Sequence, residues 1–267
     1  MRELFRKKHE LWLRFLFGSF SLPRGEMSER LMDFAGIEFR HLKWLAQKMV
    51  DEGLDFDWDR ESFSIVHISS KGLCESLLEE LRKVQRGYGV GELFERIQSD
   101  EKYMSFMLEK MQNEDIAIKA FDKELFYEGL DEGSKSALIQ FLFEELYKEY
   151  ELIVTYFYSA MHTDSVHLYK VFEDLIYESI YHLKSFALIM AKLGILSLPR
   201  VVMKEVYKFE DLKEFLQKGI EEEIAAKEQC LALSQAVKDE ELSRFFDFIN
   251  KQEDYHIVLM QKAIKML

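Results

Sequence analysis

The chain of 267 residues has few of the residues that reverse or end secondary structure. It contains 12 glycines and 2 prolines, whereas average usage in a chain of this length gives roughly 19 glycines and 13 prolines. Sandwiches and barrels need many tight turns, and glycine and proline supply most of them. The composition therefore disfavours an all-β fold before any pattern in the sequence is considered.

Cysteines and long apolar runs are scarce as well. Cys74 and Cys230 form no Cys-x-x-Cys pair, which excludes a rubredoxin-like iron centre within the chain and fits a reducing compartment. The apolar run at 11–22 follows a basic segment, but Glu10, Arg14 and the lack of a cleavage pattern do not fit a signal peptide. No other stretch reaches 18 uncharged apolar residues. We therefore expect a cytoplasmic protein without a membrane segment.

Positive charge is also in short supply. The chain has 36 Lys and Arg against 49 Asp and Glu, which gives a formal net charge of -13 and no basic cluster. Because a phosphate backbone is bound by neutralising it, nucleic acid is not expected as the main partner. The 22 Phe, 12 Tyr and 12 Met supply ample apolar surface, which excludes disorder and suffices for one large core or two small ones.

Helical periodicity is the dominant pattern in the sequence. Apolar residues recur at three- and four-residue spacings, with charges between them. Glycines and prolines such as Pro23, Gly53, Gly194 and Pro199 mark the breaks. The pattern predicts an all-α fold with eight long helices. These helices are expected at residues 2–20, 27–52, 70–86, 93–113, 135–161, 164–193, 209–236 and 239–266.

The helical pattern also repeats along the chain. A shift of 141 positions pairs His41 with His182 and Gly53 with Gly194 without a gap. The shift grows to 147 and then to 152, and both changes fall in loops between predicted helices. Such self-similarity indicates an internal duplication, in which each copy holds four helices.

The duplication divides the chain into two predicted domains. The first copy covers residues 1–113 and the second covers 135–267, with a connecting segment at 114–134. In each copy a long connection, 54–69 or 195–208, joins the second and third helices. A four-helix bundle with one long crossover is the ferritin-like topology.

Two Glu-x-x-His pairs are the main chemical signal. Glu38 and His41 lie three residues apart on one predicted helix, and Glu253 and His256 do so on another. Residues at this spacing share a helix face, so each pair can direct two ligands to one metal ion. In di-iron four-helix bundles, two helices each supply such a pair and the other two helices supply one Glu each.

On these residues the chain resembles the rubrerythrin-like branch of the ferritin-like superfamily. The resemblance covers helix order and ligand spacing in both copies, and it implies a non-haem di-iron centre. It assigns the ligand of the first helix to Glu10 in one copy and to Glu151 in the other. On the third helix of the second copy it implies Glu223, which precedes Glu253 by 30 residues, a separation common in such proteins.

Neither copy has a complete ligand set of its own. The slots without a usable ligand hold Ser76, Met104 and Ser179. Some rubrerythrin-like proteins exchange helix pairs, and an exchange between the two copies would remove the difficulty. Residues 1–53 would then pack with 209–267, and 70–194 would form the other bundle.

This exchange would produce one complete centre and one degenerate or alternative centre. The complete centre would contain Glu10, Glu38, His41, Glu223, Glu253 and His256. The second centre would contain Glu101, Glu151, Glu178 and His182.

Four carboxylates and two imidazoles suit iron, with manganese as the second choice, better than they suit structural zinc. The resemblance implies two iron ions that reduce peroxide or dioxygen with electrons from an external donor, and a homodimer is compatible with it. The alternatives are a non-catalytic iron-binding ferroxidase similar to a ferritin protomer, a di-iron oxygenase acting on an organic substrate, and a metal-free helical scaffold. The net charge of -13 counts against a tRNA-modifying hydroxylase.

Overall fold

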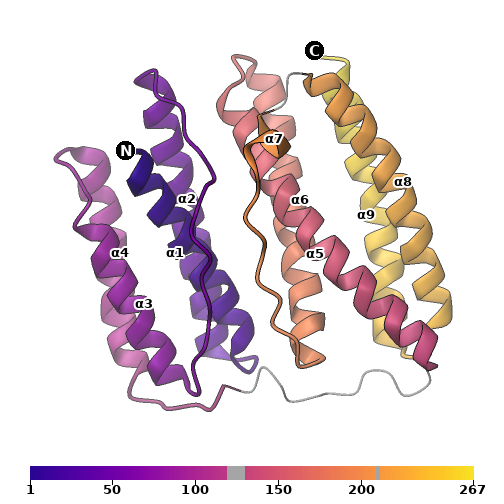
Figure 1. Ribbon diagram of the computed structural model, residues 1–267, viewed down its shortest axis with the longest axis horizontal. Helices are drawn as coiled ribbons and strands as arrows, with labels where there is room; N and C mark the ends of the chain where they lie inside the picture. Colours follow the sequence, from indigo (N-terminus) through magenta and orange to yellow (C-terminus); the bar gives the residue numbers. More distant parts are fainter. Residues whose placement is uncertain (119–129, 209–210) are drawn as a thin grey trace. The chain divides into compact units, whose positions relative to one another are not determined.

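The computed structural model describes residues 1–118, 130–208 and 211–267, and all long elements in these residues are α-helices (Figure 1). The helices are α1 (Arg2–Ser21), α2 (Glu26–Asp51), α3 (Ser70–Gln85), α4 (Glu92–Met111), α5 (Glu132–Met161), α6 (Val166–Lys192), α7 (Lys204–Tyr207), α8 (Leu212–Ala236) and α9 (Glu240–Ile264). The expected all-α class is confirmed, and the periodicity located all eight long helices. The one-turn helix α7 was not predicted. The helix start expected at 209 and much of the connecting segment 114–134 lie outside the described residues.

The chain divides into two compact units. Unit 1 consists of Met1–Asp122 with Gly194–Val201, and unit 2 consists of Lys123–Leu193 with Val202–Leu267. In unit 1, α1 packs on α2 and α3, while α4 packs on α2 and α3. Unit 2 has the same pattern, because α5 packs on α6 and α8, while α9 packs on α6 and α8 (Figure 1).

The expected exchange of helix pairs is therefore wrong. Each pair packs on the pair that follows it in its own unit, so α1 and α2 lie with α3 and α4 rather than with α8 and α9. Close packing in unit 1 gives the physical reason. A Cβ added to Gly18 on α1 would lie 3.4 Å from Leu73 Cδ1 on α3, at van der Waals distance, so these two helices of unit 1 are in direct contact.

Aromatic side chains fill much of the interior of each unit. In unit 1 the ring centroids of Phe15 and Phe34 are 5.8 Å apart, in an edge-to-face arrangement. In unit 2 Phe141 lies 5.8 Å from Phe186 and 5.7 Å from Phe246, again edge to face. Edge-to-face pairs of this kind stabilise a core beyond the area that they bury. The high aromatic content of the sequence therefore lies mainly between the helices.

Both long connections begin at a glycine in the left-handed conformation. Gly53 follows α2 with a φ of 70°, and Gly194 follows α6 with a φ of 78°. A residue with a side chain is strained at such a φ, so glycine is the usual residue just after a helix end. The chain then leaves the helix in an extended conformation. Residues 54–69 run along the length of the unit 1 helices before α3 begins (Figure 1).

Arg60 joins the two extended segments of unit 1. Its side chain is 5% exposed, and its guanidinium donates hydrogen bonds to the carbonyl oxygens of Pro199 at 2.6 Å and Arg200 at 3.0 Å. The guanidinium also lies 5.2 Å from the ring centroid of Phe63. The segment Gly194–Val201 is held on unit 1 by these contacts.

Among the described residues, no helix is both long and apolar enough to cross a bilayer.

Replacing Arg60 by Ala should weaken unit 1, because it removes the charged hydrogen bonds from its guanidinium to the carbonyl oxygens of Glu61, Pro199 and Arg200. We expect the free energy of unfolding to fall by about 2 kcal/mol. The three tryptophans, Trp12, Trp44 and Trp58, all lie in unit 1, so urea unfolding followed by tryptophan fluorescence measures this unit. Arg86→Ala, at an exposed position, is the control, and an equal loss in both variants would contradict the role of Arg60.

Candidate metal centre

Five buried side chains from all four long helices of unit 2 come together. Each of these residues is at most 2% exposed, so carboxylates and imidazoles lie together in the interior of the unit. The five are Glu149 on α5, His182 on α6, Glu223 on α8, and Glu253 and His256 on α9. We call this set the unit 2 cluster. The two α9 residues lie three apart and so share one helix face.

The unit 2 cluster consists of two groups of three that share Glu253. Glu149, His182 and Glu253 form one group, and Glu223, His256 and Glu253 form the other, with one ligand atom of each member within 4.8 Å of the others. His182 Nδ1 lies 2.9 Å from Glu149 Oε1 and 3.6 Å from Glu253 Oε1. His256 Nδ1 lies 3.1 Å from Glu253 Oε2 and 3.9 Å from Glu223 Oε1. The two oxygens of Glu253 thus face different histidines.

A second set of contacts orients the His182 ring. Gln252 Nε2 donates to Glu178 Oε2 at 3.2 Å, which leaves Gln252 Oε1 to accept from His182 Nε2 at 3.0 Å. Nε2 therefore carries a proton, and Nδ1 donates a second proton to Glu149 Oε1 at 2.9 Å, because, against the opposing effect of burial, the neighbouring carboxylates Glu149 and Glu253 raise the pKa of His182. Loss of the Nδ1 proton would free that nitrogen to bind a metal ion. Metal-binding histidines are commonly held in this way by a hydrogen bond at the other ring nitrogen.

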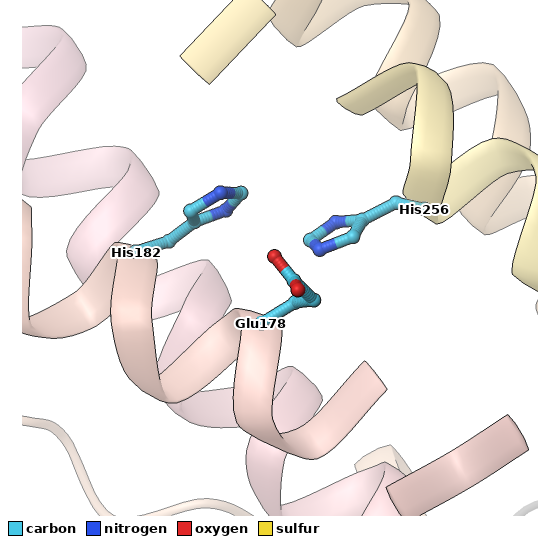
Figure 2. Close-up of side chains that lie close together, drawn as sticks. All are labelled: Glu178, His182 and His256. Carbon is cyan, nitrogen blue, oxygen red and sulfur yellow. The ribbon is translucent and has the colours of Figure 1, made fainter. Parts of the chain in front are cut away.

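Glu178 adds a further carboxylate at the edge of the cluster. Figure 2 shows Glu178 and His182 on one helix, with His256 facing them from α9. One ligand atom from each of these three residues lies within 4.8 Å of the others. The ring centroids of His182 and His256 are 4.9 Å apart. Glu178 is only partly buried, so it can reach either solvent or the cluster.

The carboxylates of the unit 2 cluster differ in acidity. Although burial alone would raise it, the pKa of Glu223 falls to about 2, because the positive charges of His256 and Lys148 lie nearby. The Lys148 ammonium is 3.6 Å from Glu223 Oε2. Burial and the neighbouring Glu223 charge raise the pKa of Glu253 to about 8. Burial acts to lower the pKa of His256, but the neighbouring carboxylates Glu223 and Glu253 raise it to about 10.

The unpaired polar atoms of the cluster fit a bound cation. Glu149 Oε2, His256 Nε2 and the Ser179 hydroxyl are buried without a hydrogen-bond partner among the described residues. Such atoms are costly unless something satisfies them. A cation would satisfy the carboxylate oxygen. Oxygen and imidazole donors suit iron or manganese, and burial raises the pKa of the nearby Cys230 thiol, which disfavours a thiolate ligand.

Unit 1 has a buried cluster of related composition but with a lysine at its centre. Lys8 Nζ donates to Glu101 Oε1 at 2.7 Å, lies 3.2 Å from His41 Nδ1 and forms an ion pair with Glu38. Lys8, Glu38, His41 and Glu101 are all fully buried. We call these four residues the unit 1 cluster. The Tyr88 hydroxyl also donates to Glu101.

The structure does not assemble the six residues of the expected exchanged centre at one place. Glu38 and His41 lie with Glu101 in unit 1, whereas Glu223, Glu253 and His256 lie in unit 2. Of the residues expected in the second centre, Glu178 and His182 lie at the unit 2 cluster. Glu101 lies in unit 1.

Glu10 and Glu151 belong to neither cluster. Glu10 is half-buried and accepts a hydrogen bond from the Glu61 backbone N–H at 3.1 Å. The inward positions are Lys8 and Glu149, two residues earlier on the same helices. Two residues correspond to about 200° around a helix, so a choice two positions late selects the opposite face.

Sequence reasoning missed Lys8, Glu149 and Gln252. A signal for the first two was present, because the shift of 141 that pairs His41 with His182 also pairs Lys8 with Glu149. This pairing puts an ionisable residue at the same position of the first helix in both copies, among the apolar residues of its inward face.

Comparisons of the chain with protein-family models, with curated proteins and with solved structures find no match. The evidence for the candidate centre is therefore the geometry of its own residues.

Metal binding at the unit 2 cluster should release protons. Near pH 7 Glu253 and His256 both hold a proton, since their pKa values are about 8 and about 10. Ligands bind a metal in their deprotonated forms, so affinity should fall on acidification, by up to about tenfold per pH unit for each proton released. Calorimetric titration with Mn²⁺ at pH 6, 7 and 8, in buffers of different ionisation enthalpy, measures the release. Affinity that does not change with pH would contradict the expectation.

Proposed function

We propose that unit 2 holds two transition-metal ions, iron or manganese, and that the protein reduces peroxide or dioxygen. The observation that supports this most directly is the sharing of Glu253 by two buried carboxylate–histidine groups. Pairs of metal ions bridged by carboxylates are typical of sites between the helices of a bundle. Bound iron or manganese would supply electrons to the oxygen substrate, which is chemistry that the side chains lack.

The residues divide naturally between two ions. Glu149 and His182 would hold one ion, Glu223 and His256 the other, and Glu253 would bridge the two. These three carboxylates carry one negative charge fewer than two divalent ions require. Glu178 at the edge of the cluster and Glu145 are the nearby carboxylates that can supply the missing charge.

Several side chains would serve the reaction without binding the metal. Gln252 and Glu178 orient the His182 ring through their hydrogen bonds. Glu145 is buried on α5, one turn before Glu149, and burial raises the pKa of its carboxyl to about 7. It can therefore hold and deliver a proton near neutral pH, and reduction of peroxide to water consumes protons. The burial of the cluster excludes bulk water.

The arrangement of the two units supports a duplicated ferritin-like architecture. In both units the first helix pair is joined by a long connection to the second pair. The repeat also matches buried positions, because Lys8 pairs with Glu149 and His41 with His182 at a shift of 141. At a shift of 152, Glu101 pairs with Glu253. A shared ancestor for the two units explains why the clusters occupy matching positions.

The proposed reaction also needs a separate electron donor. Cys74 and Cys230 are free and buried, so neither they nor any Cys-x-x-Cys motif provides an iron–sulfur centre. The electrons would come from a separate reductant.

Glu149→Ala should remove metal from unit 2, whereas Glu151→Ala should not, although the two changes are chemically identical and lie two residues apart. We expect the parent protein and Glu151→Ala to bind about two ferrous ions per chain under anaerobic conditions. Glu149→Ala should bind at most one, and its peroxide consumption with an artificial reductant should fall at least tenfold. Metal analysis and peroxide assays measure the two effects.

Three outcomes would overturn parts of this proposal. A parent protein that binds no iron or manganese would contradict the metal centre. Equal losses in Glu149→Ala and Glu151→Ala would contradict the assignment of Glu149. If the protein binds two ions but does not turn over peroxide or dioxygen, the metal centre stands and the proposed redox function is contradicted.

A further inference from the structure

We propose that the unit 1 cluster is a metal-binding site in which the Lys8 ammonium takes the place of the metal ion. Glu38, His41 and Glu101 each direct one ligand atom to a common point, with these atoms within 4.8 Å of one another. The Lys8 ammonium contacts all three residues. A cation is therefore already present among the atoms that would hold a metal.

The charge of the unit 1 cluster explains why lysine and a metal exclude each other. Lys8, Glu38 and Glu101 are all fully buried. The two carboxylates (−2) more than offset the single buried ammonium (+1), whereas an unpaired buried charge is very costly. A divalent ion added beside Lys8 would bring two more positive charges into the same interior, with no further carboxylate among the four residues. Lys8 therefore excludes the metal both sterically and electrostatically.

The histidine of unit 1 is already held as a metal-binding histidine is held. His41 Nε2 lies 3.1 Å from Asp100 Oδ2, so it donates its proton there, and Nδ1 accepts from Lys8 at 3.2 Å. In metal sites, one ring nitrogen of a histidine typically donates its proton to a carboxylate, and the other nitrogen binds the metal through its lone pair. In addition, Glu38 Oε1 and Glu101 Oε2 are buried without a hydrogen-bond partner among the described residues. A metal ion can bind more ligand atoms than the three N–H donors of an ammonium can reach, so it could also satisfy these oxygens.

Unit 2 supplies the comparison at the matching position. Glu149 lies 141 residues after Lys8, and its carboxylate is 2.9 Å from His182 Nδ1. The same helix position therefore holds a negative ligand in one unit and a positive charge in the other. The residue at this position thus decides whether the unit 1 cluster takes up a metal ion, and, resting on the proposed function of unit 2, the native chain should hold its metal in unit 2 alone.

The test uses the full chain with the unit 2 cluster disabled by Glu149→Gln and His256→Gln, so that it does not depend on the proposed function. In this background we expect Lys8→Glu to raise bound Mn²⁺ or Co²⁺ from none to about one ion per chain, measured by equilibrium dialysis. Glu38, His41, Glu101 and the new carboxylate would be the ligands. Lys7→Glu makes the same charge change at a side chain that is 43% exposed, and it should bind no ion.

Further variants exclude the remaining explanations. Adding His41→Ala to Lys8→Glu should abolish the gained ion and the visible absorption of bound Co²⁺. If Lys8→Glu unfolds without metal, Mn²⁺ should restore its tryptophan fluorescence, and Lys8→Ala should bind Mn²⁺ more weakly while folded. A folded Lys8→Glu without an added ion, an ion gained equally by Lys7→Glu, or an ion bound in unit 1 while Lys8 is present would each overturn the proposal.

Discussion

Carboxylates buried between helices need a compensating positive charge, and the interiors of both units are organised around this requirement. Unit 1 buries Glu38 and Glu101 and places the Lys8 ammonium between them. Unit 2 buries Glu149, Glu223 and Glu253 with two imidazoles, while Lys148 reaches only one of the carboxylates. In unit 2 the compensation comes from the protonated His256, from Lys148 and from a proton on Glu253. The two units thus compensate their buried carboxylates with different groups, a lysine at the centre of the unit 1 cluster and imidazoles and protons in unit 2.

The position of Lys8 also bears on the expected exchange of helix pairs between the two halves. The exchange was expected because each half of the sequence lacks part of a six-ligand set. Each half instead folds on itself, since α1 packs closely on α3 at Gly18 and Leu73. In unit 1 the Lys8 ammonium offsets one of the two buried carboxylate charges without a metal. An incomplete ligand set in each half therefore did not indicate an exchange of helix pairs.

The two buried histidines, His41 and His182, are oriented in the same way in their units. In both units one ring nitrogen contacts a side chain on the fourth helix, Asp100 in unit 1 and Gln252 in unit 2. The other nitrogen then faces the interior. The partners differ in charge, because His182 lies between a neutral amide and the Glu149 carboxylate, whereas His41 lies between the Asp100 carboxylate and the Lys8 ammonium. The pattern of contacts is the same although the charges differ.

The sequence by itself determined the helical class, the positions of the long helices and the two Glu-x-x-His pairs, because apolar periodicity and residue spacing are local properties. It did not determine which face of the first helix points inward, and Glu10 and Glu151 were chosen where Lys8 and Glu149 are buried. It also could not show which helix pairs pack together. Those choices depend on contacts between residues far apart in the chain, such as Lys8 with Glu101 and His182 with Gln252. Only the tertiary structure decided them, because the free energy of a buried charge depends on every group that surrounds it.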